Sequence, residues 1–407
     1  MTGALNIWRL ALTAVGLALV VGMAITSTVV AQERTLDELK AETQSRANRG
    51  AFPTEGLKPE EVREALGRLK SLGRDEWAAS WSIIGGRYMS KAQGELSASP
   101  AEADKDFLDA WRYYNFARWP VEISPGKKKA YEHALEAFLA HGRLLDPPLE
   151  VVHIPFEGKE IVGYLQMPKG GKPAPIVFAI NGLDSRKEEM AEKFRPLLEY
   201  GVGYFTCDAP GTGQAPIKSA PGAERMLTKA LDYVFQRPDV DKKKVVIYGG
   251  SLGGYWSAVL AATEHNRASA TVEWSGPLHE TFQRAMVMNI PHNREYLFDY
   301  LPALLNVYEK ATDLETLADA RAEMSIKTRG LLDKPMTPML VIGGVLDTQV
   351  PISDTDLILH NGQTPKDAWI NPQGGHMGRD LKGWSDARIF RTVVTPWILD
   401  KVGIKNK

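Results

Sequence analysis

A serine at position 251 lies in a pattern that is typical of nucleophilic catalysis. From Val245 to Trp256 the chain reads Val-Val-Ile-Tyr-Gly-Gly-Ser-Leu-Gly-Gly-Tyr-Trp, so a β-branched strand leads directly into Gly-x-Ser-x-Gly. This is the sequence form of a nucleophile elbow, a strained strand-to-helix turn that exposes a serine hydroxyl. Gly249 and Gly253 stand where side chains would collide across such a turn. Short Gly/Ser strings also occur in ordinary turns, so the assignment depends on partners elsewhere in the chain.

Two later residues have the types and the order that would activate this serine. A serine hydroxyl needs a base to take its proton, and a carboxylate usually holds that base in one tautomer. Asp347 follows the apolar run that begins at Met339, and His376 follows a second strand-like run through a glycine-rich loop. We therefore predict Ser251 as the nucleophile, His376 as the general base and acid, and Asp347 as the residue that orients His376.

Other acids and histidines compete for these roles. Asp354 and Asp356 follow the same strand as Asp347, but Asp347 is nearest to its end. Two histidines, His279 and His292, fall in a long insertion and are candidates for lining a pocket. His376 is favoured because it alone follows the last predicted strand in a glycine loop. Of the other histidines, His133 and His141 lie on a predicted N-terminal helix and His153 lies in the first predicted strand; the remaining two are His265 and His360.

An acyl-transfer site also needs two N–H donors for the developing oxyanion. The residue after the nucleophile usually supplies one, which here is Leu252. The second is expected from the loop after the third strand, where Asn181 and Gly182 precede Leu183. We predict the Leu183 N–H as this donor, with an ordinary Asn-Gly turn as the alternative.

Short β-rich runs alternate with helical patterns from Val151 to the C-terminus. The first two runs flank Gly158 as in a hairpin, and the later ones predict a mostly parallel, about eight-stranded sheet of the α/β class. Catalytic residues of such sheets gather at the carboxyl ends of the strands. The predicted strands are Val151–Pro155, Ile161–Met167, Ile176–Ile180, Val202–Cys207, Val245–Tyr248, Ala270–Trp274, Met339–Ile342 and Ala368–Ile370.

Helical patterns occupy two other regions. Residues 32–148 predict an N-terminal helical, lid-like domain, with one helix starting near Asp106 and an aromatic stripe, including Trp111, that we interpret as core. A helical insertion over residues 277–335 is too long for a connecting loop and is expected to lie over the strand ends. The sheet domain spans residues 149–407.

The N-terminus predicts export. An apolar run follows Arg9, and Val29-Val30-Ala31 offers small residues before a polar stretch, so residues 1–31 are interpreted as a signal peptide cleaved after Ala31. An uncleaved membrane anchor is the alternative. Either places the body of the protein in the periplasm or outside the cell.

Composition excludes several other classes. A net charge of −1 over 407 residues gives no electrostatic reason to expect nucleic acid. The single cysteine, Cys207, ends an apolar run and is expected to be buried and inert. The segment from Asp208 to Gly213 lacks the spacing of a phosphate-binding loop, and no metal or cofactor motif is present. The expected partner is a small molecule, and the oligomeric state is open, a homodimer included.

The three motifs resemble those of the α/β-hydrolase superfamily, from about Val151 onward. A closer likeness is to the esterases named after the fermentation-respiration switch protein, which resemble 2,6-dihydropseudooxynicotine hydrolase. The residues that carry it are Ser124-Pro125-Gly126-Lys127, Ala130-Tyr131, Ala134-Leu135, Phe138, Asn181-Gly182-Leu183-Asp184-Ser185, Lys187-Glu188 and Asp208-Ala209-Pro210-Gly211-Thr212-Gly213. The resemblance implies an N-terminal helical domain that packs over the hydrolase domain and helps close the active site.

Three functions follow as hypotheses. The first is a serine hydrolase that cleaves a small carboxylic ester through an acyl-enzyme. The resemblance implies a second, hydrolysis of a carbon–carbon bond next to a ketone, for which an additional acid is expected near the site; Glu280 is a candidate, with a solvated acid on the insertion as the alternative. The third is a non-catalytic binding protein on a hydrolase scaffold.

Overall fold

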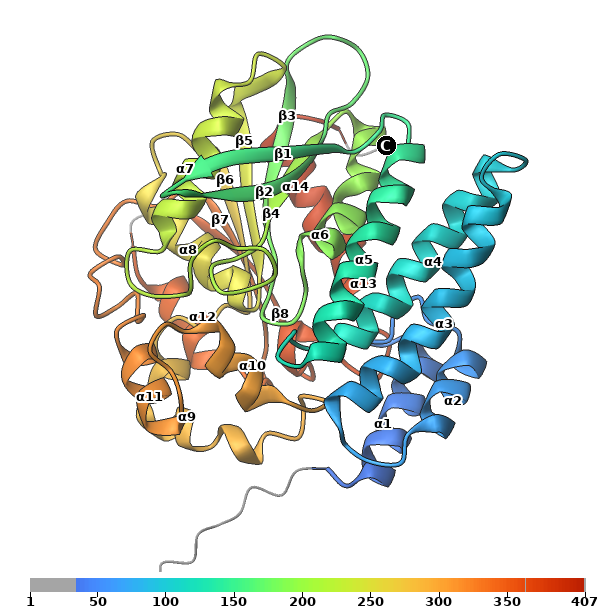
Figure 1. Ribbon diagram of the computed structural model, residues 1–407. Coiled ribbons are helices and arrows are strands. Elements are labelled where there is room, and N and C mark those ends of the chain that lie inside the picture. Colours follow the sequence, from blue (N-terminus) through green and yellow to red (C-terminus); the bar gives the residue numbers. More distant parts are fainter. Residues whose placement is uncertain (1–33, 363, 406–407) are drawn as a thin grey trace, which may run out of the picture. The chain divides into compact units, whose positions relative to one another are not determined.

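An eight-stranded sheet forms the centre of the computed structural model, which describes residues 34–362 and 364–405 (Figure 1). Every predicted strand is present, and β5 begins five residues earlier than expected because Val240 already pairs with Ala174 of β3, before a register shift that precedes Val245. The strands are β1 (Glu150–Phe156), β2 (Lys159–Gln166), β3 (Ala174–Ile180), β4 (Gly203–Cys207), β5 (Val240–Gly250), β6 (Ala270–Trp274), β7 (Met339–Gly344) and β8 (Lys366–Asn371).

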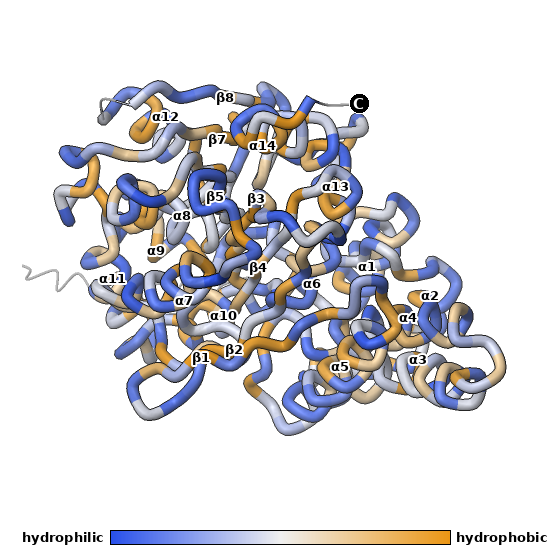
Figure 2. The backbone as a smooth tube through the Cα atoms, turned by 90° about the horizontal axis from the view of Figure 1, so that it is seen from above, coloured by the Kyte–Doolittle hydropathy of each residue, from blue (hydrophilic) through white to orange (hydrophobic). Residues whose placement is uncertain are grey.

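The strand order is β1-β2-β4-β3-β5-β6-β7-β8. The β1–β2 hairpin around Gly158 is confirmed, β2 pairs antiparallel with β4, and all later pairs are parallel. On β3, Ile176 and Phe178 face one hydrophobic cluster, whereas Val177 and Ala179 face the other. The sheet is therefore buried on both faces, and in Figure 2 the β3 and β7 labels fall on hydrophobic stretches.

Helices cover the sheet and its carboxyl end. α8 begins directly after the β5 turn, and its residues Leu252–Ala262 are all buried against the strands. The helices that connect or follow the strands are α6 (Lys187–Phe194), α7 (Glu224–Gln236), α8 (Leu252–Thr263), α12 (Ile352–His360), α13 (Asp386–Ile389) and α14 (Thr395–Lys401). The insertion after β6 contains α9 (Arg284–Met288), α10 (Tyr300–Val307) and α11 (Leu314–Ala322), which gather at one end of the sheet in Figure 1.

The N-terminal region is helical, as predicted, and one helix starts earlier than expected. α4 begins at Pro100 rather than near Asp106, because its first three residues are exposed and show no apolar periodicity, while proline is tolerated at a helix start. The aromatic stripe on α4 is core: Trp111 is 5% exposed. The helices are α1 (Leu36–Arg49), α2 (Pro59–Arg68), α3 (Arg74–Glu95), α4 (Pro100–Arg118) and α5 (Pro125–Leu144). Their separation from the sheet as a domain at residue 148 stays a prediction.

Buried ion pairs join these helices to the rest of the molecule. Arg118 at the end of α4 lies 2.9 Å from Glu189 on α6, and Arg186 lies 2.7 Å from Glu122. Both guanidinium groups are almost fully buried, and Glu122 also lies 3.7 Å from Arg118, so loss of Glu122 would weaken the compensation of both charges. These contacts fix the helical region next to the loop after β3.

Candidate active site

Ser251 occupies a strained turn between β5 and α8. Its φ of 54° and ψ of −123° lie outside the regions that non-glycine residues normally adopt. A Cβ on Gly249 would lie 1.9 Å from the Gly253 carbonyl oxygen, and one on Gly253 would lie 2.4 Å from the Ile180 carbonyl oxygen. Glycine is therefore required at both positions, and the Gly-x-Ser-x-Gly string forms the predicted elbow.

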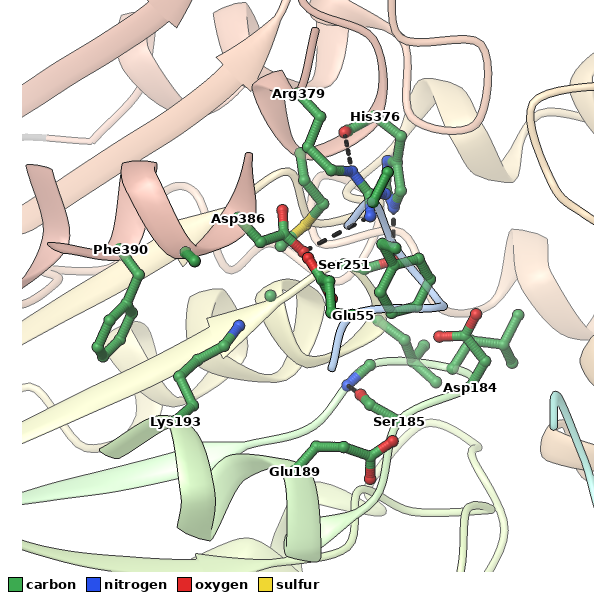
Figure 3. Close-up of a pocket in the computed structure, with 18 of the residues that line it drawn as sticks. Glu55, Asp184, Ser185, Glu189, Lys193, Ser251, His376, Arg379, Asp386 and Phe390 are labelled. Atoms are coloured by element: carbon green, nitrogen blue, oxygen red, sulfur yellow. Dashed lines mark hydrogen bonds and ion pairs between the residues drawn. The ribbon is translucent and has the colours of Figure 1, made fainter. Parts of the chain in front are cut away.

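The structure brings Ser251, His376 and Asp347 together in one hydrogen-bonded row. Figure 3 shows the contact between Ser251 and His376. His376 Nε2 lies 2.9 Å from Ser251 Oγ, and His376 Nδ1 lies 2.8 Å from Asp347 Oδ2. With the Nδ1 proton donated to the carboxylate, Nε2 is free to accept the serine proton. His376 is 4% exposed and Asp347 8%, so water competes little for these bonds.

The competing acid Asp354 has a structural role instead. Its carboxylate accepts hydrogen bonds from four successive backbone N–H groups at residues 278–281, where the insertion begins. Asp347 Oδ1 accepts the N–H groups of Gln349 and Val350, each at 2.8 Å, which leaves Oδ2 for His376. The geometry thus places Asp347, and not Asp354, beside the histidine.

The two predicted oxyanion donors flank the serine. Leu252 is the first residue of α8, and the loop that carries Leu183 approaches the elbow closely, since a Cβ on Gly182 would lie 3.5 Å from Ser251 Cβ. The Gly182 N–H donates to Ser185 Oγ at 2.9 Å. Within the residues that the structure describes, neither the Leu183 nor the Leu252 N–H has an acceptor. Both are therefore available to a ligand oxygen in the cavity that these residues line.

Glu295, on the insertion, supports the histidine loop and was not predicted. Its Oε1 accepts the His376 N–H at 2.5 Å, and its Oε2 accepts the Thr348 N–H at 3.1 Å and the Thr348 hydroxyl at 2.6 Å. One carboxylate therefore bridges the loop of the acid and the loop of the base. Glu295 follows no strand and stands in no motif, so the sequence carried no signal for this contact.

Charges around His376 favour its protonated form. Burial acts to lower the pKa of His376, but the charge and hydrogen bond of Asp347, with a contribution from Glu295, outweigh it and raise the pKa above its usual value. Burial likewise acts to raise the pKa of Glu295, yet His376 and the hydrogen bonds from Thr348 hold it below its usual value. The site therefore stabilises the imidazolium that forms when the serine loses its proton.

Ser251 opens onto a cavity of about 950 Å³. The N-terminal helical region contributes to its wall through Phe52, Glu55 and Trp111, and the insertion contributes Tyr296 and Tyr300. Figure 3 shows a group of charged side chains that face the same space from different segments. This group consists of Glu55, Lys193, Arg379 and Asp386.

Several other sequence predictions are settled by position. Glu280 is exposed and does not line the cavity, which agrees with the alternative of a solvated acid on the insertion. His279 and His292 do not line the cavity either; His279 Nδ1 lies 2.8 Å from Ser325 Oγ. Cys207 is fully buried, and burial raises the pKa of its thiol, which makes it inert.

No group of three or more histidine, cysteine or acidic side chains in residues 34–362 and 364–405 is placed to hold a metal ion. No helix within these same ranges is long and apolar enough to cross a membrane. The predicted signal peptide lies outside the described residues.

The mostly parallel sheet carries a serine on the turn after β5, an acid after β7 and a histidine after β8. This arrangement defines an α/β-hydrolase. A family model described as Esterase FrsA-like matches residues 63–373. The chain therefore belongs to the FrsA-like esterase family, and the resemblance seen in the sequence is confirmed.

Individual relatives are distant but extend over most of the chain. Esterase FrsA of Vibrio vulnificus is 24% identical over 360 residues, covering 82% of this chain and 85% of the relative. The 2,6-dihydropseudooxynicotine hydrolase of Paenarthrobacter nicotinovorans is 24% identical over 337 residues, covering 82% and 84%. A crystal structure of 2,6-dihydroxy-pseudo-oxynicotine hydrolase superposes with a TM-score of 0.72 at 21% identity, covering 86% of this chain and 95% of that one. The relatives are hydrolases, and the structural match supports the fold.

Proposed function

We propose that this protein is a serine hydrolase that cleaves a small carboxylic ester. The observation that carries the proposal is the row Ser251–His376–Asp347, with hydrogen bonds of 2.9 and 2.8 Å at the floor of a cavity. The family membership supports hydrolysis, and the unoccupied N–H groups of Leu183 and Leu252 support attack on a carbonyl.

The reaction proceeds in two halves. His376 Nε2 takes the proton of Ser251 as Oγ attacks the ester carbonyl, and the N–H groups of Leu183 and Leu252 stabilise the oxyanion. His376 then gives this proton to the leaving alcohol, and the acyl group stays on Ser251. A water molecule, deprotonated by His376, attacks the acyl-enzyme, and the carboxylic acid leaves as the serine regains its proton. Asp347 holds the imidazole in place and stabilises its charged form.

A second candidate is hydrolysis of a carbon–carbon bond next to a ketone. The match to 2,6-dihydropseudooxynicotine hydrolase favours it, because the resemblance implies this chemistry for one branch of the family. The same serine, histidine and N–H groups would act on the ketone carbonyl. Glu280, the acid that we considered for this reaction, is exposed and lies outside the cavity, so we favour ester hydrolysis.

A labelling experiment and a substrate comparison test the proposal. An aryl phosphonate is expected to label Ser251 stoichiometrically, and aryl esters are expected to be hydrolysed faster than diketones of similar size. Mass spectrometry of the labelled peptide and steady-state rates measure both. Diketone cleavage without ester hydrolysis would favour the second candidate, and an unlabelled serine would favour a non-catalytic binding protein.

The pH dependence of the rate should report the environment of His376. Only the neutral imidazole accepts a proton, and the pKa of His376 is raised. We therefore expect kcat/KM to rise with pH, and the midpoint of this rising limb to lie above the usual pKa of histidine. Glu295→Gln removes one negative charge beside His376, so it is expected to move this limb to lower pH by about half a pH unit.

The same variant is also expected to lower kcat by about tenfold, because an amide cannot accept hydrogen bonds from both Thr348 and His376 at its two ends. Glu199→Gln is the matched control, since Glu199 lies at the exposed rim of the same cavity. An unshifted limb in Glu295→Gln would contradict the assignment.

We also propose that the protein is exported, with cleavage after Ala31. The support is the apolar run and the small residues at its end. N-terminal sequencing of the mature protein from its native cell fraction tests this: a chain beginning at Gln32 agrees with cleavage, and an intact N-terminus contradicts it.

A further inference from the structure

Arg321 differs from the other buried cations of the described residues because it has no carboxylate partner. Five arginine and lysine side chains are buried in residues 34–362 and 364–405. Four of them have a carboxylate oxygen close by: Arg118 at 2.9 Å, Lys127 at 3.4 Å, Arg186 at 2.7 Å and Lys187 at 2.8 Å. Arg321 is 3% exposed, its Nε is buried without an acceptor, and no carboxylate in the described part of the chain forms an ion pair with it.

Aromatic rings hold the Arg321 side chain in place. Its guanidinium carbon lies 5.2 Å from the centre of the Phe282 ring and 5.8 Å from that of Tyr308. Burial raises the pKa of Tyr308, and the neighbouring guanidinium opposes this rise. A phenol and two ring faces attract a cation, but they do not neutralise it. The positive charge therefore remains uncompensated by the protein.

Arg321 lines the same cavity as Ser251. It projects from α11 of the insertion, and Tyr300 and Leu304 of α10 line this cavity as well. In Figure 1, α10 and α11 lie together at the end of the sheet where the strands carry the active-site loops. A molecule that fills this cavity can therefore touch both the nucleophile and the guanidinium.

A buried charge without a partner is costly, and an anion brought by a ligand would remove that cost. The planar guanidinium matches a carboxylate, whose two oxygens can accept parallel N–H donors. A single guanidinium between rings suits one carboxylate better than a phosphate dianion, which requires several donors.

We propose that Arg321 binds a carboxylate carried by the substrate, so that the preferred ester has an anionic group at the end remote from the reacting carbonyl. This proposal rests on the proposed ester hydrolysis and specifies its substrate class. The insertion thus supplies specificity, while the sheet supplies the reacting groups.

Matched esters test the proposal. Para-nitrophenyl monoesters of glutaric, adipic and pimelic acid are compared with neutral esters of equal length and with ω-ammonium counterparts. The wild-type protein is expected to prefer the carboxylate at one length by about tenfold to a hundredfold in kcat/KM. In Arg321→Met the ratio of kcat/KM for the carboxylate ester to that for the neutral ester of equal length is expected to fall to about one, and Arg321→Lys is expected to keep part of the preference.

Arg284→Met is the control, because Arg284 is an exposed arginine on α9 of the same insertion and lies outside the cavity. Binding of adipate to Ser251→Ala gives a readout without turnover and is measured as a rise in melting temperature. This rise should vanish in the double variant Ser251→Ala/Arg321→Met. Equal rates for carboxylate and neutral esters at every length, a preference for ammonium, or a preference that survives Arg321→Met would overturn the proposal. If the protein hydrolyses none of the esters but binds adipate in an Arg321-dependent manner, only the proposed ester hydrolysis would be refuted, and the carboxylate site would stand.

Discussion

Replacement of Ser251 with alanine is expected to lower kcat for aryl ester hydrolysis by roughly 10⁴-fold to 10⁶-fold. The hydroxyl is the atom that forms the acyl-enzyme, and alanine leaves only the oxyanion donors and the binding surface to act on the ester. The fold should persist, because the strained backbone at this position tolerates a Cβ already. Initial rates over a range of ester concentrations measure the effect, and far-UV circular dichroism verifies the fold.

Ser257→Ala is the matched control for this loss. Ser257 is also buried on α8, but its hydroxyl donates to the Gly254 carbonyl at 2.9 Å and does not reach the cavity. Its removal should cost about 1 kcal/mol of stability and change kcat by less than about twofold. Hydrolysis by Ser251→Ala at the wild-type rate would refute the nucleophile assignment outright.

Asp347→Asn is expected to lower kcat/KM by roughly 10³-fold to 10⁴-fold near neutral pH, with little change in KM. The amide cannot stabilise the imidazolium, and if its NH₂ group faces His376 the ring is held in the wrong tautomer. The pKa of His376 should fall as well, since the Asp347 charge is the main influence that raises it. The remaining activity should therefore show its rising limb at lower pH than the wild type.

Asp356→Asn distinguishes this effect from a general loss of negative charge. Asp356 follows the same strand but is exposed on α12, so this variant should keep the wild-type rate. Asp354→Asn is expected to act differently again: it weakens the four backbone hydrogen bonds at the start of the insertion and should lower the melting temperature. A normal rate in Asp347→Asn would reassign the orienting acid.

The strands and the elbow were predictable because neighbouring residues decide them. Buried parallel strands require continuous apolar runs, as at Ile176–Ile180, and the turn at Ser251 requires glycine at two fixed positions. The order of serine, acid and histidine then followed from which loops end on the same edge of the sheet. The start of α4 was missed because its first three residues are exposed and carry no periodic signal.

The sequence by itself thus determined the sheet, the nucleophile elbow and the residues Ser251, His376 and Asp347. The tertiary structure alone decided which residues support and complete the site. Glu295 reaches His376 across 81 positions of the chain. Arg321 is distinctive because it is buried and no carboxylate of the described residues forms an ion pair with it, a property that no motif can record. The physical reason is that backbone geometry and hydrophobic periodicity act over a few residues, whereas charge pairing and cavity walls depend on how distant segments pack.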